Sequence, residues 1–200
     1  KIDLHLYLRS RFIDKGYKVS QIGTKKISGL FGLHPLPDFL FNTQYSDVDK
    51  VYAFNRVMKD VSMQEKPDVI LLGIPDSLLP LNNKHRFSFG LYAYEIFNAV
   101  QPDFVITSLM ANNGYNDEFY SEISKMAKYK YNVNIDAYFV SQFCPLSNSI
   151  WSEKLSYVYL PQMELPKTEY KVYTTSDLNN DILFKQAEKK LLLYGKYEQY

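Results

Sequence analysis

The sequence is poor in the residues that cross-link small domains or bind metals. Cys144 is the single cysteine among 200 residues, which excludes an internal disulfide framework and a cysteine-based zinc site. His5, His34 and His85 are far apart in the sequence and show neither His-x-x-x-His nor Glu-x-x-His spacing, so we expect no metal site built on histidine. A chain of this length needs no such support, since it can bury about 70% of its unfolded surface.

Long hydrophobic runs and an excess of one charge are also missing. No apolar run approaches the ~18 residues that span a bilayer, and no signal peptide is visible. The 23 basic and 22 acidic residues leave a net charge of +1, whereas nucleic-acid binding needs a basic face or stripe. We therefore expect a cytoplasmic protein with no membrane and no nucleic-acid partner.

Aromatic residues stand out among those that are present. The chain has 18 Tyr and 13 Phe but one Trp. Tyrosine has an apolar ring and a polar tip, which suits both cores and sticky surfaces. Two interpretations stay open: ordinary packing by residues that AT-rich coding favours, or a tyrosine-rich binding surface.

Hydrophobic periodicity predicts helices and strands in alternation. Helices are expected over residues 4–13, 90–100 and 117–129. Another helix is expected from a cap at Asp47 to the break at Lys66-Pro67. A terminal helix is expected from a cap at Ser176 or Asp177 to about Tyr194. Strands are expected over residues 17–22, 69–74, 104–109, 133–140, 156–160 and 171–173. Residues 141–166 are otherwise expected to be irregular. Short continuous apolar runs such as 69–74 are typical of strands buried on both faces of a parallel sheet.

This order predicts one α/β domain over residues 1–200, with a doubly wound, mostly parallel sheet and helices on both faces. Such folds usually begin with a strand, whereas this chain begins with a helix. We therefore expect the first strand and its loop to lie upstream, and the chain to be the C-terminal part of a longer protein. Ligands of such sheets bind at the carboxyl ends of the strands.

Lys1 and the first strand end supply the first candidate site residues. Lys1 directly precedes the first helix, where a phosphate-binding loop carries its lysine. Ile2 stands where such a loop has the Ser or Thr that ligates Mg²⁺. Gly23 and Thr24 follow the strand ending at Ile22 and are candidates to meet phosphate, although a simple turn explains them equally well.

Two later segments supply the remaining candidates. Asp76 follows an apolar strand, as does the carboxylate that orients Mg²⁺ in many nucleotide hydrolases, but it falls beyond Pro75 and also fits an exposed turn. Asn83 and Lys84 lie in a polar loop that could bind an anion or a base, or could simply be solvated.

Several blocks resemble a known family. They are residues 1–10, 16–25 (beginning Gly-Tyr-Lys-Val-Ser-Gln-Ile-Gly), 30–34 (Leu-Phe-Gly-Leu-His), 66–75, 80–84 and 86–95. Together they resemble a clostridial peptide-maturation-system family, a set of accessory proteins encoded beside radical-SAM peptide-modifying enzymes in ribosomal peptide natural-product clusters. The resemblance covers nearly the whole chain, more loosely after Gly114.

The resemblance implies a C-terminal P-loop NTPase-like domain with Lys1 as the loop lysine. It implies ATP or GTP with Mg²⁺ as ligands, and a radical-SAM maturase or a precursor peptide as partner. Ile2 and the lack of a carboxylate within Leu71-Leu72-Gly73 depart from an active hydrolase. We expect a degenerate accessory domain that binds a partner, a peptide or a nucleotide. The alternatives are an active ATP or GTP hydrolase whose loop lies upstream, and a purely structural interaction domain. The oligomeric state stays open.

Overall fold

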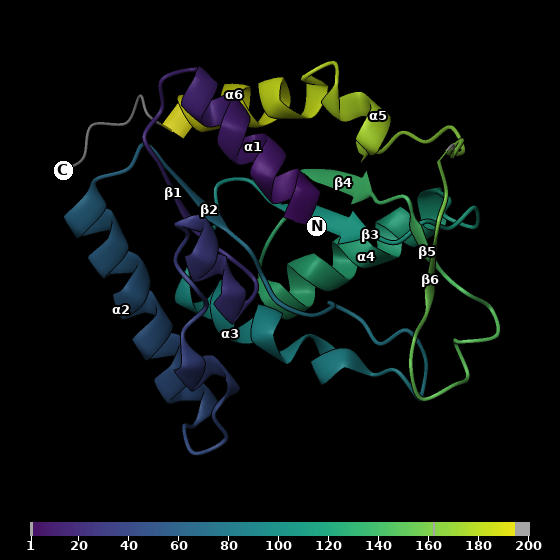
Figure 1. The fold of residues 1–200 in the computed structure, drawn as a ribbon, viewed down its shortest axis with the longest axis horizontal. Coiled ribbons are helices and arrows are strands. Elements are labelled where there is room, and N and C mark those ends of the chain that lie inside the picture. Colours follow the sequence, from purple (N-terminus) through teal and green to yellow (C-terminus); the bar gives the residue numbers. More distant parts are fainter. Residues whose placement is uncertain (1, 162, 195–200) are drawn as a thin grey trace. The chain divides into compact units, whose positions relative to one another are not determined.

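The computed structural model describes residues 2–161 and 163–194 (Figure 1). It is an α/β structure whose strands, within these residues, form two parallel sheets and one antiparallel pair, which confirms the predicted class. The chain divides into two compact units, Lys1–Gln101 and Pro102–Tyr200. One domain over residues 1–200 stays a prediction.

Unit 1 alternates helices with a parallel pair of strands. Its elements are α1 (Ile2–Asp14), β1 (Val19–Ile22), η1 (Lys26–Phe31), η2 (Asp38–Phe41), α2 (Asp47–Glu65), β2 (Val69–Leu72), η3 (Phe87–Gly90) and α3 (Leu91–Ala99). β1 and β2 pair in register from Val19 opposite Val69 to Ile22 opposite Leu72. The other side of β1 forms an isolated parallel bridge between Ile22 and His34.

Helices cover both faces of this pair. Leu72 and the following Ile74 pack into a core with Phe54 of α2 and Ile96 of α3. Gly73 lies between them, and because side chains alternate along an extended chain its position faces the other way, toward His5 of α1. Val69 to Leu72 are each partly buried, and the helices on both faces explain why residues 69–74 are continuously apolar.

Local signals set the ends of α2. The sequence prediction named Asp47 as the cap, but Ser46 occupies that position and its hydroxyl accepts the Asp49 N–H at 3.2 Å. Asp47 is the first helical residue, where an acidic side chain favours the positive helix end. Lys66 adopts the left-handed conformation with φ 47° and ends the helix before Pro67.

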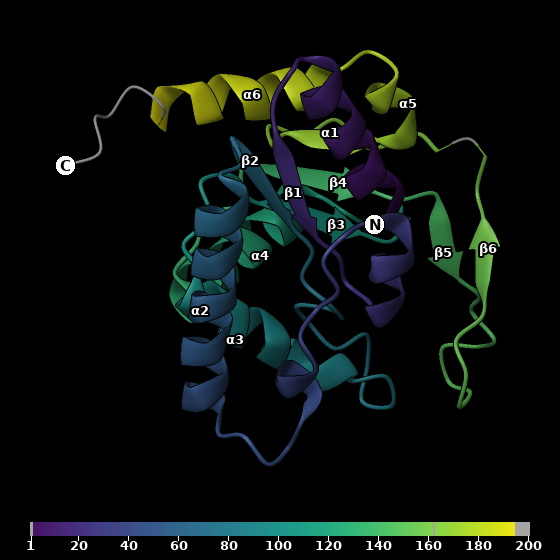
Figure 2. The same cartoon turned by 60° about the vertical axis from the view of Figure 1, so that its left-hand side comes forward.

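Unit 2 contains a three-stranded parallel sheet and a separate hairpin-like ribbon. Its elements are β3 (Ile106–Leu109), α4 (Asp117–Tyr131), β4 (Ala137–Val140), β5 (Phe143–Pro145), β6 (Tyr157–Tyr159), β7 (Val172–Thr174), α5 (Thr175–Leu178) and α6 (Ile182–Tyr194). The sheet order is β3-β4-β7. β5 pairs with β6 antiparallel, and these two strands lie side by side (Figure 2). Val172 packs against α4 residues, while the next residue, Tyr173, donates its hydroxyl to Gln186 of α6, so α4 and α6 lie on opposite faces.

Three sequence predictions in unit 2 need correction. Strand β4 begins at Ala137 rather than at residue 133, and β5 forms within the segment that was expected to be irregular. The terminal helix divides into α5 and α6 around Asp181, whose φ is 55°. Its cap is Thr174, which forms a capping box with Asp177. The capping box lets α5 begin directly after β7.

Tyrosines form much of the unit 2 core. Tyr120 and Tyr138 are 1% and 2% exposed, and their ring centroids are 4.8 Å apart. Tyr138 Oη donates to the Tyr120 carbonyl at 3.0 Å and lies 2.7 Å from Ser124 Oγ. The tyrosine content therefore partly serves ordinary packing, with the polar tips hydrogen-bonded as burial requires.

No helix among the described residues is both long enough and apolar enough to cross a membrane.

Candidate functional site

The carboxyl ends of β1 and β2 meet at one edge of the unit 1 sheet. Gly73 N–H donates to the Ile22 carbonyl at 2.9 Å, which extends the pairing by one residue beyond the strands. A Cβ built on Gly73 would lie 2.4 Å from His5 Cε1 and 2.6 Å from Thr24 Cγ2. The missing side chain thus lets His5 of α1 and Thr24 of the β1 loop lie directly over the end of β2.

Close packing explains why residue 23 is a glycine. Its N–H donates to the His34 carbonyl at 2.9 Å, and a Cβ there would lie 2.0 Å from Ser28 Oγ. Ser28 thus fills the space beside the Gly23 backbone. The sequence analysis named Gly23 as a candidate to meet phosphate. In the structure the Ser28 side chain occupies the space beside Gly23.

The other predicted residues lie near strand ends or outside the description. Lys1 lies outside the described residues. Asp76 is exposed, three residues beyond Gly73, with φ 64°, which is the left-handed turn conformation that Asp tolerates better than most residues.

The loop around Asn83 and Lys84 is organised by its neighbour Asn82. The Asn82 amide oxygen accepts the Lys84 and His85 N–H groups, each at 2.8 Å. The Asn83 carbonyl accepts from Arg86 Nε at 2.9 Å. Asn83 and Lys84 are exposed. His85 Nε2 is buried without a hydrogen-bond partner among the described residues. Both predicted residues therefore belong to an ordered polar turn.

A second polar cluster joins β1 to the end of α2. Glu65 accepts a hydrogen bond from the buried Ser20 hydroxyl through one carboxylate oxygen, and its other oxygen lies 2.5 Å from His34 Nε2. The Ser20 hydrogen bond lowers the pKa of Glu65 below its usual 4.5; burial opposes this, and His34 adds to it. Ser20 and His34 both contact the carboxylate rather than each other, so the cluster lacks the nucleophile–base pair of a hydrolytic triad.

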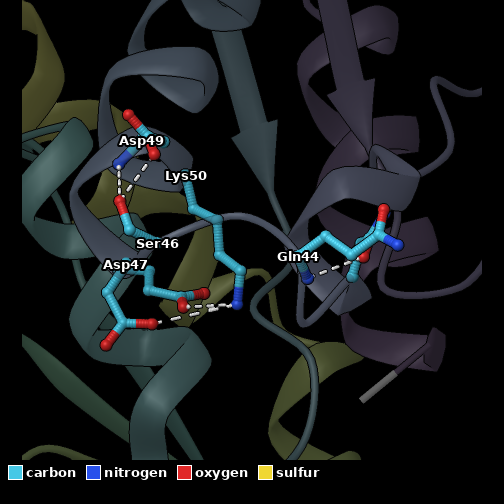
Figure 3. A network of polar contacts seen from close by, with 7 residues as sticks. Gln44, Ser46, Asp47, Asp49 and Lys50 are labelled. Carbon is cyan, nitrogen blue, oxygen red and sulfur yellow. Dashed lines mark hydrogen bonds and ion pairs between the residues drawn. The ribbon is translucent and has the colours of Figure 1, made fainter.

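A buried ion pair links α2 to α3 (Figure 3). Lys50 Nζ lies 3.1 Å from Glu95 Oε1 and 3.9 Å from Asp47 Oδ1. Glu95 is fully buried, and burial raises the pKa of its carboxyl while the Lys50 ammonium offsets part of the rise. Its second oxygen has no hydrogen-bond partner within the described residues.

Sequence reasoning missed His5, Gly73 and both polar clusters. Gly73 at the end of an apolar run carried a usable signal, since glycine at a strand end often marks close approach of another group. Ser20, His34 and Glu65 are 14 and 31 residues apart along the chain and follow no motif.

Among the described residues no three His, Cys, Asp or Glu side chains lie together as metal ligands. No family model, curated protein or solved structure matches the chain. The site is thus defined by its own geometry, a polar edge at two parallel strand ends beside the first turns of α1.

Proposed function

We propose that the chain is a non-catalytic accessory domain of ribosomal peptide natural-product maturation, built on a degenerate, doubly wound P-loop NTPase-like fold. Its ligand site is the edge of the sheet at the carboxyl ends of β1 and β2, beside Thr24 and His5, with Lys1 contributing a phosphate contact. The partner is a radical-SAM maturase or its precursor peptide.

One observation carries the nucleotide-binding part of this proposal. His5 and Thr24 both lie against Gly73. The first turn of α1 therefore lies at the carboxyl ends of two parallel strands. In open α/β sheets that edge is where ligands bind. The N–H groups at a helix start favour an anion such as a phosphate.

The same edge lacks the parts that hydrolysis needs, which favours binding over turnover. β2 has only Val69-Ile70-Leu71-Leu72 and so offers no carboxylate. Asp76 sits in an exposed turn beyond the strand, and Ile2 offers no hydroxyl. Phosphoryl transfer depends on Mg²⁺ held by such groups.

The test is thermal melting of the full-length protein with and without ATP or GTP and Mg²⁺. A nucleotide at 100 times its Kd stabilises the folded state by about 2.7 kcal/mol, which raises Tm by several degrees. We expect this shift to disappear in Lys1→Ala and to persist in Lys15→Ala, a matched exposed lysine at the other end of α1.

Two outcomes would overturn the proposal in different directions. Steady ATP turnover that is lost in Lys1→Ala would favour the active hydrolase. No shift with either nucleotide would remove the nucleotide site and leave a pure interaction domain. The exposed aromatic residues of unit 2 favour that second candidate: Phe143, Tyr157 and Tyr159 are 47%, 48% and 53% exposed.

A further inference from the structure

The outer strand of the β5–β6 ribbon has an open edge. β5 is held on both sides, because it pairs with β6 and its Phe143 carbonyl accepts the Ala111 N–H at 2.8 Å. Among the strands of the described residues β6 pairs only with β5, and it lies on the outer side of the ribbon (Figure 2). An unpaired strand edge is a template for another extended chain.

The hydrogen-bond pattern tells which backbone groups point outward. Leu146 N–H donates to the Ser156 carbonyl at 2.9 Å, and Leu160 N–H donates to the Gln142 carbonyl at 2.8 Å. In an antiparallel pair every second residue bonds to its partner. Tyr157 and Tyr159 are the alternate residues, so their N–H and C=O groups point away from β5.

The side chains make one face of the ribbon aromatic. Phe143 lies opposite Tyr159 and Pro145 opposite Tyr157, and residues two apart share a face. The Phe143 and Tyr159 rings meet edge to face with centroids 5.5 Å apart. The Tyr159 hydroxyl donates to Gln142 Oε1 at 2.9 Å, which holds the ring in place on an otherwise exposed surface.

Part of the usual protection of an edge strand is missing here. Natural edges are protected by very short strands, charged side chains, prolines or bulges; β6 is short, with three residues, but it lacks the side chains that block pairing. Tyr157-Val158-Tyr159 carries no charge and no proline, and Pro161 comes only after the strand has ended.

The size of this surface distinguishes between its possible occupants. The three residues of β6 span about 10 Å at ~3.4 Å each. Complete cover of an aromatic ring buries about 150–250 Å², so covering the exposed parts of Phe143, Tyr157 and Tyr159 removes roughly 200–400 Å². A stable protein dimer needs about 800 Å² from each partner. The area is too small for a second copy of this chain and fits a short extended peptide.

We propose that β6 binds an extended peptide by strand addition. The backbone groups of Tyr157 and Tyr159 pair with the peptide backbone, and apolar side chains at alternate peptide positions contact the aromatic face. This names a partner class for the accessory role and rests on the proposed function only for the source of the peptide.

The experiment selects binders from a phage-displayed library of random heptapeptides against the full-length protein, then measures their Kd as blocked synthetic peptides. Tyr157→Pro removes one outward N–H and one ring of the aromatic face without removing a bond to β5, because proline is tolerated where the N–H faces solvent. We expect it to weaken binding roughly fivefold to tenfold. Tyr157→Phe keeps both backbone and ring and should bind as the wild type does, as should Tyr129→Ala, which removes an exposed tyrosine from α4.

A second measurement changes the peptide rather than the protein. N-methylation of the peptide positions that face β6 should abolish binding, whereas N-methylation of the intervening positions should not. The proposal is overturned if no peptide is enriched, if Tyr157→Pro binds as tightly as Tyr157→Phe, or if both methylation patterns act alike. A concentration-dependent dimer that Tyr157→Pro dissociates would instead assign the edge to a second copy. The assay contains no nucleotide, so its failure and that of the melting test are independent.

Discussion

The two units use the same alternation of helices and parallel strands but bury different chemistry. Unit 1 buries a charged pair, Lys50 against Glu95, and a hydroxyl, Ser20, which donates to the partly exposed Glu65. Unit 2 packs tyrosine on tyrosine around Tyr120 and Tyr138. Buried charge is costly without a partner, whereas a buried phenol needs a single hydrogen bond. Unit 1 should therefore be the more sensitive to loss of one polar partner.

The largest effect is expected at the buried ion pair. Lys50→Met leaves the fully buried Glu95 carboxylate without its cation and should lower the free energy of unfolding by about 3–5 kcal/mol. Lys50→Met combined with Glu95→Leu should recover most of that loss, because no unpaired charge remains. Urea denaturation followed by circular dichroism measures both. Lys125→Met breaks an exposed pair with Glu122 and should leave the free energy of unfolding unchanged. If Lys50→Met also left it unchanged, the proposed contrast between the two units would be wrong.

A smaller effect is expected where α1 meets the strand ends. Gly73→Ala puts a methyl group against His5 and Thr24, and such overpacking costs about 1–3 kcal/mol. Gly29→Ala is the matched control, since a Cβ at Gly29 meets nothing within 4 Å. In a double-mutant cycle measured by thermal melting, His5→Ala should relieve part of the Gly73→Ala cost. Additive effects of the two changes would show that the ring and the glycine do not share this space.

The smallest effect is expected in unit 2. Tyr138→Phe removes the hydroxyl that bonds to the Tyr120 carbonyl and contacts Ser124 while leaving the ring stack in place. A net loss of about 1 kcal/mol is expected, measured by urea denaturation. Tyr129→Phe, at 82% exposed, should be neutral. If Tyr138→Phe lowered the free energy of unfolding as much as Lys50→Met, the proposed difference between the polar core of unit 1 and the aromatic core of unit 2 would be wrong.

Periodicity predicted most elements because their signals are local. The i, i+4 spacing of Leu4, Leu8 and Phe12 gave α1, and these three are the residues that α1 buries. β5 was missed because its partner β6 lies twelve residues further along the chain, and three residues carry too little pattern by themselves. The break between α5 and α6 falls at Asn179-Asn180-Asp181, a run of turn-favouring residues that the periodicity analysis passed over.

The site was predicted less completely than the fold. Gly23, Thr24 and Asp76 do follow strand ends, as the motif reasoning expected. His5, Ser20, His34 and Glu65 gain their meaning from tertiary contacts. The bridge between Ile22 and His34, which no spacing rule gives, brings His34 to the end of α2.

That bridge also has a topological consequence. His34 N–H donates to Gln21 and Gly23 N–H donates to His34, both at 2.9 Å, so the chain between Gly23 and His34 is a ring closed by backbone hydrogen bonds at its base. Leu30 and Phe31 at its far side are 82% and 70% exposed. Each doubling of a loop's length adds only about 0.6 kcal/mol of closure entropy. The ring therefore offers an insertion point: a fluorescent or affinity module spliced at Leu30 would interrupt η1 but leave the hydrogen bonds of His34 with Gln21 and Gly23 in place.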